Sequence, residues 1–107
     1  MSETENTIAK LQEEAYAVLK TIYDPEIPVN IYDLGLIYKV TITGTRCDVL
    51  MSLTSPTCPM SDVLVYQIEN RVKLIDGIDQ VTVEITFDPP WQQDMISEEG
   101  QLKLGLL

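Results

Sequence analysis

The chain has 107 residues, and its 17 acidic and 7 basic side chains give a formal net charge of −10. This length fits one domain, and an apolar content of 45% is enough for one core. A negative surface repels phosphate backbones and anionic lipid, which argues against nucleic-acid and membrane-surface roles and favours a basic protein partner. The sequence contains no histidine, so the usual general base, the usual zinc ligand and any Cys-His dyad are missing.

The lack of a recognisable targeting signal and the spacing of the cysteines predict a cytoplasmic protein. No apolar run approaches the ~20 residues that span a membrane, and the first residues lack the basic and apolar regions of a signal peptide. Cys47 and Cys58 do not have the spacing of a metal-ligand pair. We therefore expect a cytoplasmic protein with free thiols.

The first predicted element is a helix over residues 8–22, where apolar side chains recur at helical spacing. Residues 1–6 are polar and are expected to be disordered, with Asn6 or Thr7 as the helix cap. The Asp24-Pro25 pair is expected to end the helix, because the residue before a proline disfavours helical backbone angles.

A long connection and a β-hairpin follow. Residues 23–35 contain two prolines and a glycine, and connections of this length in compact domains are often functional. Residues 36–42 and 47–53 alternate between apolar and polar, as half-buried strands do, and 44–46 reads as the hairpin turn between them.

The rest of the chain predicts a helix, a strand and a short last helix. An apolar stripe over 60–75 indicates the helix, which Asp76-Gly77 ends. Residues 81–87 form the third strand. Ser97 is expected to cap the last helix, which ends at Gly105.

The element order α-β-β-α-β-α predicts an α+β fold. Each strand has one apolar face, so we expect two layers, with the helices packed on one face of a three-stranded mixed sheet. The opposite, open face is mostly polar, and its predicted members are Lys39, Thr41, Asp48, Ser52, Thr82, Glu84 and Thr86, with Ile37 and Leu50 as apolar exceptions.

This topology brings three unusual segments to one end of the sheet, here called the rim. The hairpin is antiparallel, and the helical crossover makes the third strand parallel to the second. Segments 24–35, 55–59 and 88–91 should therefore converge where the second and third strands end, which is where open α/β sheets place their sites. Their chemically active side chains are Asp24, Glu26, Asp33, Thr57, Cys58, Asp88 and Trp91.

Cys58 is the strongest candidate at the rim. Pro59 suits the first position of the following helix, which makes Cys58 the cap. Free backbone N–H groups and the helix dipole favour a thiolate there and should lower the pKa of Cys58, although the carboxylate of Asp62 acts in the opposite direction. Cys47 lies on an apolar strand face and is interpreted as core packing.

Structural roles remain open for the other rim residues. Asp24 begins a turn that also stops a helix, and Asp33 could form an Asx-turn before Gly35. Trp91 could simply cover the end of the core.

The same segments carry a family resemblance. The chain resembles the SufT/PaaD-like family through DPEIPVNIYDLGLIY at 24–38, TSPTCPM at 54–60 and FDPPW at 87–91. The resemblance extends from about residue 8 to 105. It implies a compact α/β fold related to the C-terminal domain of NifU. It also implies that this chain, like the small cytosolic proteins of the family, takes part in iron–sulfur cluster biogenesis.

The resemblance also implies site residues. It places the reactive cysteine at Cys58 and acidic motif positions at Asp24, Glu26 and Asp33. We predict Cys58, Asp33, Glu26 and Thr57 as cofactor-binding residues, Cys58 as a shared or transient metal ligand, and no catalytic residue.

The main functional hypothesis is an accessory factor in iron–sulfur protein maturation. It would act through Cys58 as a transient carrier of a cluster or iron, or as a targeting adaptor. Clusters usually take four protein ligands, so a single thiol needs a second subunit, a partner's cysteines or glutathione. The expected partners are iron–sulfur scaffold or client proteins, or a second copy of the chain, for which the open sheet face is one candidate contact.

The sequence is also compatible with other functions. One is an interaction adaptor that holds no metal. Another is a maturation factor for the phenylacetyl-CoA oxygenase, although the chain lacks the cysteine-rich zinc segment of that PaaD branch. A cysteine-nucleophile enzyme is the least favoured, because there is no histidine to serve as its base.

Overall fold

The computed structural model describes residues 3–24, 26–54 and 61–106. Its elements follow the predicted order, with one short 3₁₀ helix that the sequence did not indicate. They are α1 (Glu3–Leu19), β1 (Ile37–Thr43), β2 (Arg46–Met51), α2 (Ser61–Lys73), β3 (Gln80–Ile85), the 3₁₀ helix η1 (Gln93–Met95) and α3 (Glu98–Lys103).

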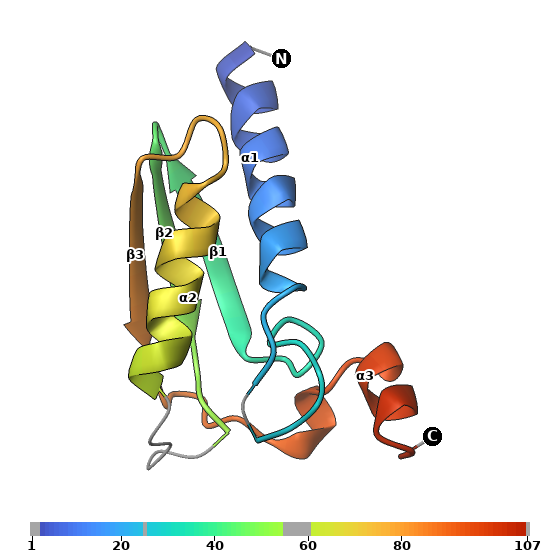
Figure 1. Cartoon of the computed structure of the whole chain (residues 1–107). Helices are drawn as coiled ribbons and strands as arrows, with labels where there is room; N and C mark the ends of the chain where they lie inside the picture. Colours follow the sequence, from blue (N-terminus) through green and yellow to red (C-terminus); the bar gives the residue numbers. More distant parts are fainter. Residues whose placement is uncertain (1–2, 25, 55–60, 107) are drawn as a thin grey trace.

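The sheet has the predicted mixed topology. Its strand order is β1-β2-β3, with β1 antiparallel and β3 parallel to β2. α1 packs on β1 and α2 packs on β3, and Figure 1 shows both helices on the same side of the sheet. The two-layer α+β fold is therefore confirmed. No helix within the described ranges is long and apolar enough to cross a membrane.

The core lies between the sheet and the two long helices and extends into the loop after α1. Cys47 is fully buried in it, as predicted for a packing residue. The largest fully buried apolar side chains are Leu19, Ile22, Ile31, Leu34, Leu36, Met51, Ile68, Val29, Val49 and Val72.

The first helix differs from its prediction at both ends. It begins at Glu3, before the expected cap at Asn6 or Thr7, so residues 3–6 are helical and not disordered. Extension is favourable because each further residue adds one hydrogen bond once a helix exists. The helix ends at Leu19, and the amide N of Ile22 bonds to Leu19 O at 3.2 Å in a tighter turn.

At one end of the sheet, the side chains on the two faces differ from the prediction. The pairing of β1 with β2 shifts between Ile37 and Lys39, which takes Tyr38 out of regular alternation. Ser52 was predicted on the open face, but its side chain is fully buried. The strand ends at Met51, so the two-residue alternation no longer decides where Ser52 points.

Candidate functional site

Two of the three predicted rim segments meet in the structure. The indole Nε1 of Trp91 donates a hydrogen bond to Leu34 O at 2.6 Å, and the Tyr38 hydroxyl donates to Pro89 O at 2.9 Å. Figure 1 shows the loop after α1 and the segment after β3 lying together at the lower end of the sheet. The third segment, with the predicted site residues Thr57 and Cys58 and the helix start at Pro59, lies outside the described residues.

The end of β2 lies between these two loops. The amide of Ser52 donates to Leu36 O at 2.8 Å, and the amide of Thr86 donates to Met51 O at 2.8 Å. The chain thus leaves β2 between the start of β1 and the exit of β3.

Asp24 has a structural role in its loop. Its Oδ1 accepts hydrogen bonds from the backbone N of Glu26 at 2.7 Å and of Ile27 at 3.1 Å, which closes the turn expected after the helix. The Asp24 side chain is buried, whereas Glu26 is exposed. The carboxylate of Glu26 is thus available to solvent at the rim.

Asp33 is the centre of a buried hydrogen-bond network. Its Oδ2 accepts from Asn30 Nδ2 at 2.7 Å, and its Oδ1 accepts from Ser97 Oγ at 3.0 Å. Asn30 Oδ1 in turn accepts from the backbone N of Asp33 at 2.8 Å. Both carboxylate oxygens therefore bind protein donors, and no hydrogen bond within the described ranges joins Asp33 to Glu26.

Ser97 connects this network to the last helix. Its side chain caps α3 by accepting from the backbone N of Gly100 at 3.1 Å, as predicted for the cap. Its own amide donates to Asp33 O at 2.7 Å. The cap was visible in the sequence, but the partners Asn30 and Asp33 were not, because nothing local marks a contact across 64 positions.

Gly35 lets the two rim loops approach closely. Its φ of 79° lies in the left-handed region, and the position of a Cβ there would collide with the backbone of Met95 in η1. A side chain at this position would separate the loop from η1. The glycine in the predicted 24–38 motif therefore has a packing reason.

Two hydroxyl groups just after β2 have no hydrogen-bond partner among the described residues. Ser52 Oγ and Thr54 Oγ1 are shielded from solvent, and neither binds another atom within the described part of the chain. Unpaired buried hydroxyls are uncommon, since burying one costs free energy. The alternating pattern predicted Ser52 on the open face, and no local signal in the sequence marks this pair of hydroxyl groups.

The described residues offer no ready-made metal centre. Among them, no three side chains of His, Cys, Asp or Glu are grouped so as to hold a metal ion. The described thiol, Cys47, is a poor ligand, because burial and then the neighbouring Asp48 carboxylate raise its pKa to about 11.

Comparison with known families decides the relationship that these motifs suggest. Residues 12–85 match the model of a family described as iron–sulfur cluster assembly protein. The chain belongs to this family. The match covers the C-terminal part of α1, the loop after it, the three strands and α2, whereas the segment after β3 that carries Trp91 lies beyond it.

Individual relatives agree with this membership. An Fe-S protein maturation auxiliary factor from Porphyromonas gingivalis is 43% identical over 103 residues, covering 95% of this chain and 98% of that protein. An iron-sulfur cluster carrier protein from Synechocystis is 32% identical over 88 residues, covering 80% of this chain but only 25% of that protein. The crystal structure of a domain of unknown function, DUF59, from Bacillus anthracis superposes with a TM-score of 0.89 at 27% identity, covering 96% of this chain and 99% of that one.

Proposed function

We propose that this protein is an accessory factor in the maturation of iron–sulfur proteins. The observation that carries the proposal is the match, over nearly the full length of both chains, to a protein named as a maturation auxiliary factor. The shared length also favours this general role over a role confined to the phenylacetyl-CoA oxygenase. The cluster, or its iron, is the cargo of the protein and Cys58 is the residue that contacts it.

The ligand count supports a transient mode of action. No group of three ligating side chains occurs among the described residues, and Cys47 is buried with a raised pKa. Cys58 therefore supplies one thiolate, and the remaining ligands come from a scaffold, a client or a second copy of the chain. Shared ligation suits a carrier, because a cargo that is held by few bonds from one protein is easily passed to the next.

Glu26 and Asp33 have different parts in this proposal. The Glu26 carboxylate is exposed at the rim and is free to approach iron or a basic partner. Asp33 acts indirectly, since both of its carboxylate oxygens accept hydrogen bonds from Asn30 and Ser97. Its role is to fix the loop that carries Glu26, and we propose no catalytic residue.

Anaerobic reconstitution tests the role of Cys58. The purified protein is incubated with iron and sulfide without oxygen, and the visible absorption spectrum is recorded for the wild type, Cys58→Ala and Cys47→Ala. We expect a cluster spectrum in the wild type and in Cys47→Ala, which is the matched thiol control, and its loss in Cys58→Ala. An equal spectrum in Cys58→Ala would remove Cys58 from the proposal.

A metal-free adaptor is the second candidate function. The observation that favours it is the absence of a three-ligand group among the described residues. It predicts no cluster spectrum in any variant, together with unchanged binding of client proteins by Cys58→Ala. Binding measured by calorimetry against an apo-ferredoxin distinguishes this result from the carrier function.

A further inference from the structure

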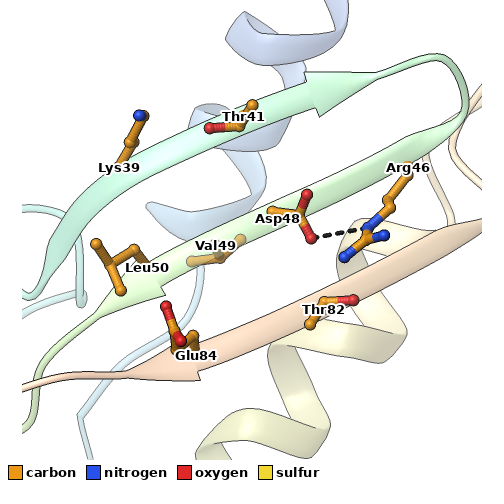
Figure 2. Close-up of a pocket in the computed structure, with 8 residues that line it drawn as sticks. All are labelled: Lys39, Thr41, Arg46, Asp48, Val49, Leu50, Thr82 and Glu84. Carbon is orange, nitrogen blue, oxygen red and sulfur yellow. Dashed lines mark hydrogen bonds and ion pairs between the residues drawn. The ribbon is translucent and has the colours of Figure 1, made fainter.

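The open face of the sheet carries a row of three side chains, one from each strand. Lys39 of β1 pairs with Leu50 of β2, and Leu50 pairs with Glu84 of β3. Lys39 and Glu84 are exposed and Leu50 is half-buried, and Figure 2 shows all three on one face of the sheet. Across the sheet the row is therefore positive, apolar and negative.

A second row has balanced charge as well. Asp48 pairs with Thr41 on one side and Thr82 on the other, and its Oδ1 accepts from Arg46 Nε at 2.9 Å. These side chains and those of the first row line a shallow hollow of about 420 Å³. The hollow contains two basic and two acidic side chains, whereas the whole chain has a net charge of −10. Two copies therefore repel each other less through this face than through a face that carries the average negative charge of the chain.

We propose that this open face is the interface of a symmetric homodimer. The two-fold axis runs parallel to β2 and passes over Leu50. Rotation about this axis places each Lys39 opposite the partner's Glu84 and packs the two Leu50 side chains against each other, because the three residues share one row. The same patch serves both copies, so the assembly closes as a dimer.

The other charged side chains of the face do not oppose this dimer. The two Asp48 side chains approach across the axis, but each is already neutralised by Arg46 of its own chain. Aligned sheets pack about 10 Å apart, a gap that long Lys and Glu side chains can bridge. The contact is mostly polar, so we expect a weak dimer whose dissociation constant rises with salt.

The direction of the axis has a consequence for the rim. Rotation about an axis parallel to the strands keeps their direction, so both copies present the ends of β2 and β3 at the same end of the dimer. A dimer formed through the free edge of β3 in antiparallel pairing would place the two rims at opposite ends. The face-to-face dimer thus places the two rims at the same end, and the supply of ligands from both rims to one cargo rests on the proposed function.

Charge reversal tests the pairing. Lys39→Glu places two carboxylates opposite each other in both contacts, since the partner's Glu84 faces this position, and Glu84→Lys places two lysines together. By sedimentation velocity over a concentration series, we expect each single variant to dimerise at least ~10-fold more weakly than the wild type. An equimolar mixture of the two variants should recover dimerisation to near the wild-type level, since their heterodimer contains only pairs of opposite charge.

Matched controls separate this effect from net charge and folding. Lys103→Glu on α3 and Glu13→Lys on α1 change the net charge equally at exposed positions away from the face, and they should keep wild-type dimerisation. Circular dichroism establishes that each variant is folded.

Three results would overturn the interface. They are a wild-type chain that stays monomeric up to ~1 mM, single variants that dimerise as the wild type does, and a mixture that fails to recover. Cluster reconstitution is measured separately. A dimer without a cluster would leave the interface standing, and a cluster on a monomer would leave the proposed function standing.

Discussion

Ser97 holds Asp33 by two hydrogen bonds, one from its backbone and one from its side chain. The amide of Ser97 donates to Asp33 O at 2.7 Å, and its hydroxyl donates to Asp33 Oδ1 at 3.0 Å. The same hydroxyl caps α3. The C-terminal helix and the loop after α1 are thus fastened at one residue pair, next to the rim.

Removal of the Ser97 hydroxyl should destabilise the fold. Ser97→Ala loses both the cap of α3 and a bond to a buried carboxylate, so we expect a loss of about 1–2 kcal/mol in the free energy of unfolding. Urea denaturation followed by circular dichroism measures it. Thr43→Ala, at an exposed strand end, serves as a control and should change stability by less than about 0.5 kcal/mol. Equal stability of Ser97→Ala and the wild type would show that the pair contributes little.

Gly100 should not tolerate a methyl group. It is buried in α3, and an added Cβ would lie 2.7 Å from Ile96 Cγ2 and 3.2 Å from Asp33 O. Alanine normally stabilises a helix relative to glycine, but here the overpacking should cost about 1–3 kcal/mol. Thermal unfolding of Gly100→Ala beside Glu99→Ala, on the exposed side of the same helix, measures the difference. A rise in melting temperature for Gly100→Ala would contradict the close packing of α3.

The hydrogen bond of Trp91 should contribute to the joining of the two rim loops. Trp91→Phe keeps an aromatic ring but loses the donor to Leu34 O, so we expect a loss of about 1 kcal/mol. Amide hydrogen exchange should increase in the loops around Leu34 and Trp91 more than in β2. Uniform change across the sheet would instead indicate a general effect on the core.

Cys47 should make stability depend on alkaline pH. Burial raises its pKa in the folded protein to about 11, whereas an unfolded thiol titrates near about 8.5. The folded state favours the protonated thiol, so this contribution to stability is complete below about pH 8.5 and is lost as the pH rises towards 11. In a Cys58→Ala background, stability should fall over this range more steeply with Cys47 than with Cys47→Ala.

Labelling of the same variants gives an independent check. With Cys58 replaced, Cys47 is the remaining thiol, and it should react with a disulfide reagent at pH 8 only when the protein unfolds. Rapid labelling of the folded protein would show that Cys47 is accessible, against its full burial.

The fold could be predicted largely because its signals are local. Alternation of apolar residues indicated the strands, helical spacing indicated α2, and Ser97 was recognised as a cap. The predicted start of α1 was wrong because polar residues can extend a helix that is already formed. The predicted placement of Ser52 on the open face was wrong because the alternation was extended past Met51, where the strand ends.

The rim was predictable as a place but less so in its details. Strand directions bring the loops around Leu34 and Trp91 together, as expected from the hairpin and the crossover. The pairing of Asp33 with Asn30 and Ser97 and the contact of Gly35 with Met95 depend on long-range packing, which no local pattern specifies. The predictions for Cys58 and Thr57 concern residues outside the described ranges and remain predictions.

Transfer of cargo to a client tests the central claim most directly. The reconstituted protein is mixed anaerobically with an apo-ferredoxin in the presence of an iron chelator, and the growth of the ferredoxin spectrum is followed. We expect transfer from the wild type and from Cys47→Ala to resist the chelator, and Cys58→Ala to transfer nothing above free iron and sulfide. Equal, chelator-resistant transfer by Cys58→Ala would contradict a maturation role that acts through this thiol.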